Sequence, residues 1–250
     1  MRLPIALLAV LLLTGARDPI LVPEVSQHEV QVRQGFTGTE LLLFGAILTP
    51  DGTRAGRDYD IVVVLKGPTQ SIVVREKQKV AGIWINADSA GFRSAPSYYA
   101  VASSRPIRQI VDEKTAAIYE FGLRNIQLSP IGAIDPAQQA RFAAGLAALK
   151  TGEGLYKQAE GGVKISEQVL YQARITLPSS VPTGTYTAET FAISKGWVVA
   201  SATSRIEVRK IGFEGAIARF AQNSSFSYGL LAVALSVLMG WLAGRLFALI

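Results

Sequence analysis

The chain has 250 residues with no cysteine and one histidine, His28. This composition excludes a thiol nucleophile, a disulfide framework and a cysteine-histidine zinc site, and a Ser-His-Asp triad would have to use His28. The 25 Lys and Arg outnumber the 19 Asp and Glu but are scattered, which favours a weak preference for anionic surfaces and argues against nucleic-acid binding.

Residues 1–16 have the pattern of a secretory signal peptide. Arg2 supplies a positive start, Leu3–Leu13 is apolar but too short to span a bilayer, and Thr14–Ala16 offers small residues at a cleavage site. Cleavage there predicts a mature chain that begins at Arg17 and is translocated across the membrane. A retained N-terminal anchor is the alternative.

Residues 17–104 form a predicted N-terminal β-sandwich region. The expected strands are short and separated by turns: Glu29–Arg33, Glu40–Leu48, Tyr59–Leu65, a hairpin of Ser71–Glu76 with Val80–Ile85, and Tyr98–Ala102. Glu29–Arg33 alternates with period two, as a half-buried strand does, whereas Glu40–Leu48 and Tyr59–Leu65 are apolar on both faces, as central strands are. Short strands at regular spacing, with Gly and Pro between them, favour a β-sandwich.

Residues 105–162 change period, which predicts a helical connector. Thr115–Gly122 is weakly helical. Asp135 at an N-cap, Pro136 at the first helical position and Gln138 three residues beyond the cap form a clear helix start. Three apolar side chains on one face of this helix are expected to pack on a neighbour: Phe142, Leu146 and Leu149.

Residues 163–210 return to strands and form a predicted C-terminal immunoglobulin-like β region. The expected strands are Val169–Leu177, Thr185–Ser194 and Trp197–Val208. Tyr186, two residues after Gly184, is similar to a tyrosine corner, whose phenol bonds back to the preceding crossover. Three strands are few for an independent sandwich, so they either complete the first sheet system or pack on the helix after Asp135. Whether the β regions form one composite or two sandwiches stays open.

Residues 211–225 are expected to form a juxtamembrane amphipathic helix. Phe213, Ile217 and Phe220 would share one face, with Arg219 beside them, as in a helix that lies at the headgroups. A further helix packed on the β domain is the alternative.

Residues 226–250 are expected to form a transmembrane helix in the lipid bilayer. The run from Tyr228 to Gly244 carries no charge, and a spanning helix needs about 20 mostly apolar residues. Arg245 would reach the headgroups at one end, which fits a cytoplasmic C-terminus with the bulk of the chain outside the cytoplasm. A buried core helix is the alternative.

Small residues recur every four positions along this helix: Ala232, Ser236, Gly240 and Gly244. Gly240 and Gly244 form a GxxxG motif, which lets a second helix approach closely. The pattern predicts self-association, or association with a membrane-protein partner, through the transmembrane helix. The alternative is that small residues are simply common in such helices.

Candidate binding residues lie in two places. Trp84, Asn86 and Asp88 place an aromatic ring, an amide and a carboxylate together at an expected strand end, and Arg105 offers a site for an anion. An ordinary strand-to-loop turn is the alternative interpretation of Trp84–Ser89. The sequence indicates no catalytic residue, metal site or cofactor. It also contains no phosphate loop, because the glycine-rich segment at 152–154 lacks the lysine and the strand that such a loop needs.

Four segments carry a resemblance to a known family: Phe36–Gly45, Lys79–Asn86, Tyr99–Pro106 and Tyr228–Trp241. In these segments the chain resembles a family of alphaproteobacterial transmembrane proteins that has no assigned biochemical activity. The resemblance implies a protein of the bacterial inner membrane that faces the periplasm. Members tend to be encoded near a sulfite/organosulfonate-type exporter, which implies an accessory role, and the family offers no catalytic residues to transfer.

Two classes of function follow. The first is an anchored periplasmic accessory or interaction module that binds a membrane-protein partner and performs no catalysis. The second is an anchored periplasmic domain that binds or hydrolyses a small ligand near Trp84–Ser89 and Arg105. A deep pocket with convergent polar groups would favour the second, and an exposed apolar patch the first.

Overall fold

The computed structural model describes residues 19–33, 35–48, 59–167, 169–211, 217 and 220–247. The predicted signal peptide at 1–16 lies outside these residues, as do Phe213 and Arg219 of the predicted juxtamembrane helix.

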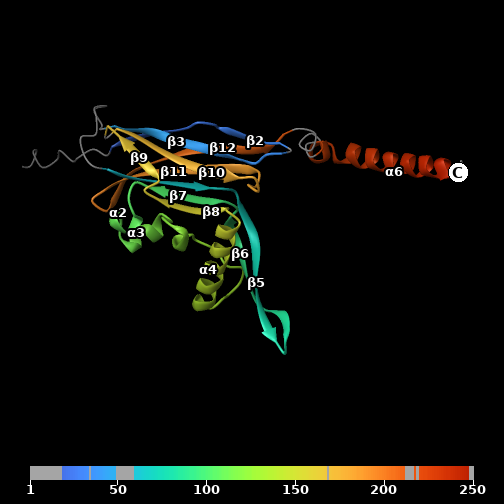
Figure 1. Ribbon diagram of the computed structural model, residues 1–250, viewed down its shortest axis with the longest axis horizontal. Coiled ribbons are helices and arrows are strands. Elements are labelled where there is room, and N and C mark those ends of the chain that lie inside the picture. Colours follow the sequence, from blue (N-terminus) through green and yellow to red (C-terminus); the bar gives the residue numbers. More distant parts are fainter. Residues whose placement is uncertain are drawn as a thin grey trace, which may run out of the picture.

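Two sheets form the body of the protein (Figure 1). Sheet A contains, in spatial order, β1 (Ile20–Val25), β3 (Gly38–Leu48), β10 (Leu170–Pro178) and β9 (Val163–Ser166). Sheet B contains β2 (Glu29–Val32), β12 (Trp197–Lys210), β11 (Gly184–Ser194), β4 (Asp60–Lys66), β7 (Tyr99–Ser103) and β8 (Tyr156–Glu160). Neighbouring strands are antiparallel except β2 with β12 and β7 with β8.

Both sheets combine strands from the two predicted β regions. In sheet A, β10 pairs with β3, and in sheet B, β11 lies between β4 and β12. The late strands therefore complete the early ones in one composite sandwich. The fold is mainly β, with a helical insertion and an apolar C-terminal helix, as the sequence predicts. Its assignment as immunoglobulin-like stays a prediction.

The core lies on both faces of sheet B. Every residue of β4 from Ile61 to Leu65 is fully buried, which confirms the prediction of a central strand. Side chains of sheet A cover one face of sheet B, including Leu41 and Tyr171. The other face carries the helical segment formed by α2 (Ile107–Ile110), α3 (Glu113–Ile118) and the turn η1 (Leu123–Asn125). In this segment the ring of Phe121 packs edge-on against Phe191 of β11, 5.0 Å between centroids.

Two local details fix how the strands approach one another. The Tyr186 hydroxyl donates to the Pro182 carbonyl at 2.7 Å, the contact predicted for a tyrosine corner. In β3, a Cβ added to Gly45 would lie 2.2 Å from the Val22 carbonyl oxygen and 2.6 Å from Tyr171 Oη. Only glycine therefore lets β1, β3 and the Tyr171 ring pack this closely.

A long hairpin leaves the sandwich between β4 and β7. It consists of β5 (Thr69–Val80) and β6 (Ile83–Pro96), which form a separate two-stranded sheet, and we call it the finger. An isolated antiparallel bridge from Phe92 of β6 to Pro130 adds to this pairing. Figure 1 shows the finger running away from the sandwich to a free end, with α4 (Pro136–Gly152) beside its first half. The prediction of a hairpin here is confirmed, but the predicted strands were too short and the turn was expected at residues 77–79, whereas it lies at Ala81–Gly82. Trp84–Ser89, expected as a strand end or a turn, lies inside β6.

Helix α4 begins as predicted. Asp135 accepts hydrogen bonds from the backbone nitrogens of Ala137, at 3.0 Å, and Gln138, at 3.2 Å. Phe142 and Leu146 are buried in a small second core against the finger. Leu149 is 59% exposed, so its predicted packing is wrong: the second core ends at Leu146, and the last turn of α4 lies beyond it.

Helix α6 (Ser225–Phe247) is apolar, and the described part of the chain buries none of its span from Ser225 to Arg245. It is long and apolar enough to cross a membrane. The alternative of a buried core helix is therefore wrong.

Candidate functional site

The outer end of the finger is exposed on all sides. We call residues 77–87 the finger tip, and every one of them is exposed. Its large apolar side chains have exposed fractions of 51% for Val80, 69% for Ile83, 66% for Trp84 and 45% for Ile85. Grouped apolar exposure of this kind is uncommon on soluble surfaces and marks places where proteins bind partners or membranes.

The strand register divides the finger tip into two faces. Val80 pairs with Ile83 and Gln78 with Ile85, and these pairs alternate with Lys79–Trp84 and Lys77–Asn86. Because successive side chains of a strand point to opposite faces, the aliphatic side chains share one face. The ring of Trp84 shares the other face with two lysines and an amide.

Two irregularities shape the finger tip. Ala81, with φ of 50°, and Gly82, with φ of 87°, form the two-residue turn at its end. Positive φ at both positions is typical of a type I′ turn, in which a non-glycine residue such as Ala81 is strained. The register shifts between Glu76 and Lys77, where Ala87 lies unpaired as a bulge. Bulges bend a hairpin and redirect its side chains.

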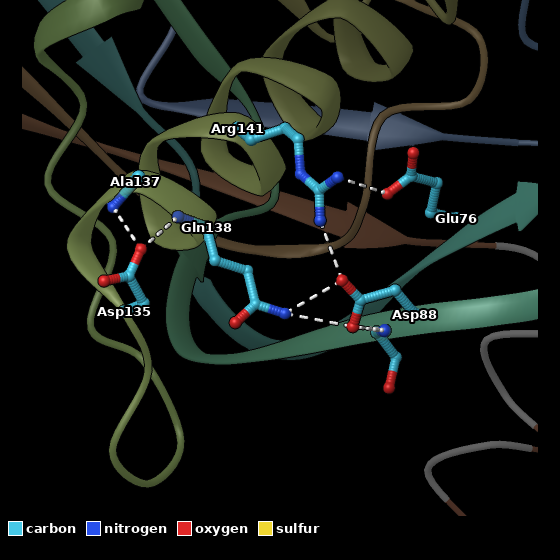
Figure 2. Close-up of polar contacts among 7 residues, drawn as sticks. Glu76, Asp88, Asp135, Ala137, Gln138 and Arg141 are labelled. Atoms are coloured by element: carbon cyan, nitrogen blue, oxygen red, sulfur yellow. Dashed lines mark hydrogen bonds and ion pairs between the residues drawn. The ribbon is translucent and has the colours of Figure 1, made fainter.

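Four side chains hold the finger against α4 just before the tip begins (Figure 2). Arg141 of α4 places Nη1 3.1 Å from Glu76 Oε2 and Nη2 2.7 Å from Asp88 Oδ2, so one guanidinium joins both strands. Gln138 Nε2 donates to both Asp88 oxygens, at 3.0 and 2.9 Å. We call Glu76, Asp88, Gln138 and Arg141 the latch.

The latch gives Asp88 a structural role. Besides Gln138 and Arg141, the backbone nitrogen of Ser89 donates to Asp88 Oδ1 at 2.8 Å, so both oxygens of the carboxylate are engaged within the chain. The sequence proposed Asp88 as a ligand-binding group. In the structure this carboxylate positions the base of the finger tip.

Arg105 is also engaged. Its guanidinium forms a bidentate ion pair with Asp60, and Ser104 Oγ donates to Asp60 Oδ1 at 2.8 Å. Burial alone would raise the pKa of Asp60, but the hydrogen bonds from Arg105 and Ser104 and the charge of Arg105 outweigh it, so the pKa lies below its ordinary value. These contacts hold the start of β4 against the residues that follow β7.

The four predicted binding residues do not form one site. In the antiparallel pair β4–β7, Lys66 lies opposite Tyr99 and Val62 opposite Ser103. The finger leaves at the Lys66 end, while Arg105 follows Ser103 at the other end. Trp84 and Asn86 share an exposed face of the finger tip, and their role in binding stays a prediction.

Sequence reasoning missed the finger tip as a unit, although a signal was available. Turns are normally polar, yet Val80 and Ile83–Ile85 surround the Ala81–Gly82 turn. Apolar residues on both sides of a two-residue turn, with Lys77 and Lys79 just before them in the chain, predict an exposed apolar end.

The chain also contains a cluster of one lysine and two carboxylates. Lys66 Nζ contacts Glu120 and lies 3.3 Å from Glu189 Oε2, while Glu120 Oε1 accepts from the Gln127 nitrogen at 2.8 Å. Burial alone would lower the pKa of Lys66, but the two carboxylates raise it above its ordinary value. The cluster ties the helical segment to sheet B. Within the described ranges no three His, Cys, Asp or Glu side chains are arranged to hold a metal ion.

The small residues of α6 lie uncovered. A Cβ added to Gly240 or Gly244 would meet nothing within 4 Å, and Ser236 Oγ donates to the Ala232 carbonyl at 2.9 Å, so the hydroxyl is satisfied within the helix. This face leaves room for another helix. The predicted association through Ala232, Ser236, Gly240 and Gly244 stays a prediction.

The comparisons with known proteins agree with this architecture. A family model described as Putative transmembrane protein (Alph_Pro_TM) matches residues 20–248, which include the sandwich, the finger and α6. No curated protein matches the chain. The chain therefore belongs to this family of transmembrane proteins, anchored in a membrane by helix α6.

Proposed function

We propose that the chain is a membrane-anchored accessory module, without catalysis, that binds a membrane-protein partner through the finger tip. The observation that carries this proposal is the uncovered apolar end of the finger at Val80 and Ile83–Ile85. Grouped apolar side chains that are exposed and surrounded by polar ones are typical of a binding surface.

The contacts that hold the finger against α4 favour binding. The latch and the second core under Phe142 fix the base of the finger tip before any partner arrives. A surface that is already ordered loses less conformational entropy on binding, so more of its contact energy contributes to affinity.

The two faces of the finger tip indicate what the partner offers. Trp84 is a residue type that often dominates interface energetics when it enters a pocket. Lys77 and Lys79 lie beside it on the same face. A complementary partner would have an apolar groove with carboxylates along one side.

The setting we propose is the periplasmic face of the bacterial inner membrane, with the C-terminus in the cytoplasm. The signal-peptide pattern at 1–16 and the charge of Arg245 support this orientation. The family resemblance makes a sulfite/organosulfonate-type exporter the first partner to test. A small-ligand or hydrolytic site has less support, because Trp84 and Arg105 lie on different parts of the fold.

Site-specific photo-cross-linking in native membranes tests the proposal. A photoreactive amino acid at Ile83 should give an adduct with an integral membrane protein. The same amino acid at Ile118 of α3, which is 60% exposed, is the matched control and should give none. Adding Lys77→Glu and Lys79→Glu should weaken the adduct at least tenfold if the partner side is acidic.

Three results would contradict the proposal. The first is adducts with lipid alone, and the second is equal protein adducts from Ile83 and Ile118. The third is no adduct from Ile83 in membranes that also contain the proteins encoded beside this one. Identification of the captured protein by mass spectrometry decides whether the exporter is the partner.

A further inference from the structure

A cavity of about 370 Å³ lies between α4 and the chain that follows η1. It is separate from the finger tip. The chain from Leu123 to Leu128 forms one side, α4 the other, and the ring of Tyr156 on β8 lines it as well. Its volume lies near the lower end of the range for small-molecule sites.

The cavity exists because one face of α4 consists of alanines. Ala140, Ala143, Ala144 and Ala147 all line it, and the spacing of three and four residues places them on one stripe of the helix. No side chain on this stripe extends beyond Cβ. The space opposite Ile126 and Leu128 is therefore left unfilled, whereas Phe142 and Leu146 on another face of α4 pack tightly.

The lining offers few polar atoms inside. The hydroxyl of Tyr156 donates to the Pro96 carbonyl at 2.7 Å, so its hydrogen is committed elsewhere. Most of the lining consists of aliphatic side chains, and ordered water needs two to four polar partners. An apolar occupant therefore suits the cavity better than water.

Among the described residues that line the cavity, only Arg124 carries a charge. Its side chain is exposed, and no ion pair within the described chain neutralises it. A guanidinium stays protonated and presents a planar fork that matches the two oxygens of one carboxylate.

We propose that this cavity binds one long-chain fatty acid, with the alkyl chain along the alanine stripe of α4 and the carboxylate paired with Arg124. The volume suits a single alkyl chain. The membrane that holds α6 supplies such molecules locally. The proposal does not depend on the finger tip having a protein partner.

A photoreactive palmitate with a diazirine on its alkyl chain tests the site. The full chain is placed in phosphatidylcholine nanodiscs, irradiated with the probe and digested. Mass spectrometry should find adducts within residues 123–128 and 140–147. Ala144 is exposed and lines the cavity, so Ala144→Phe, which places a ring over the cavity, should reduce these adducts at least tenfold. Ala148→Phe is the matched control, because Ala148 is exposed on the same helix and does not line the cavity.

The charge requirement is tested separately. Arg124→Gln should weaken labelling about tenfold, whereas Arg108→Gln, also exposed, should not. Unlabelled palmitate should compete at least tenfold better than its methyl ester. In a series of shorter acids, each added methylene should strengthen competition about fourfold until the cavity is full. Because Arg124 is exposed, this variant keeps the test informative if Ala144→Phe fails to fold.

The proposal is overturned by adducts on α6 alone, which would report the bilayer and not the cavity. It is equally overturned if cavity adducts survive Ala144→Phe in a folded protein. Equal competition by palmitate and its methyl ester would show that Arg124 does not bind the carboxylate, which also contradicts the proposal. An absence of cavity adducts in nanodiscs, where no other protein can occupy the site, overturns the proposal as well.

Discussion

Arg105 and Asp60 form a bidentate ion pair at the end of sheet B opposite the finger, with Arg105 Nε 2.8 Å from Asp60 Oδ1. The carboxylate is mostly buried, whereas the guanidinium is half exposed. Removal of Arg105 should therefore destabilise the fold more than removal of Asp60, because it would leave the poorly solvated charge of Asp60 without its partner.

Arg105→Ala should lower the free energy of unfolding by about 1 kcal/mol near pH 7, and Arg105→Lys by less. The pKa of Asp60 is lowered in the folded state, so its contribution is complete above its ordinary value of 3.8 and is lost as pH falls through the folded pKa. Urea denaturation of wild type and Arg105→Ala in mild detergent should show curves that converge at acid pH. A gap that stays constant down to pH 2.5 would contradict this assignment.

Removal of residues 226–250 should yield a soluble, folded β protein. Among the described residues, none buries the span from Ser225 to Arg245, so the truncation should remove no core contact. Circular dichroism and a cooperative thermal transition check this outcome. Aggregation, or loss of the sheet signal, would mean that the anchor is part of the fold.

Arg141→Ala should loosen the finger without unfolding the sandwich. It removes both ion pairs of the latch and leaves Asp88 with Gln138 and a backbone nitrogen. Hydrogen exchange should accelerate in the outer half of β5–β6 and in the first turns of α4, with a stability loss of about 1 kcal/mol. Arg108→Ala is the control. Equal acceleration in β4 and β11 would show that the effect is global.

The Lys66 cluster should control stability at alkaline pH. A pKa above the ordinary 10.5 means that this contribution is complete below that value and is lost as pH rises through the folded pKa. Lys66→Arg keeps its charge and should lose less stability than wild type between about pH 10 and 12. Lys66→Met should cost about 3 kcal/mol at pH 7, because it leaves two part-buried carboxylates without their partner. Identical alkaline curves for wild type and Lys66→Arg would assign the loss to other groups.

Gly240→Ile with Gly244→Ile should reduce association of α6 while leaving insertion unchanged. The larger side chains fill the space beside the helix but keep it apolar. Energy transfer between labelled chains, or cross-linking to a co-expressed partner, measures the change in native membranes. Equal association in both proteins would identify α6 as an anchor alone.

Features determined by neighbouring residues could be predicted from the sequence. The start of α4 is one, because Asp135 bonds to nitrogens only two and three residues away. Burial of β4 is another, because its apolar run is continuous. Tyr186 is a third, since its partner Pro182 lies four residues earlier.

Features that depend on distant pairing could not be predicted. Asp88 and Arg141 are 53 residues apart, and no local pattern identifies them as partners. Strand β1 was missed because Pro23 interrupts its pattern, which an edge strand tolerates. Strands β8 and β9 were also missed: they are short and largely polar.

The attachment of the anchor to β12 has a mechanical consequence. This strand is the last one before α6, and it pairs with β11 from Trp197 to Val208 and with β2 from Glu207 to Lys210. The hydrogen bonds of both ladders run across the strand. A force on the anchor along β12 therefore loads many of these hydrogen bonds at once in shear, and they do not break one after another. The anchor therefore follows a strand whose two ladders resist tension together.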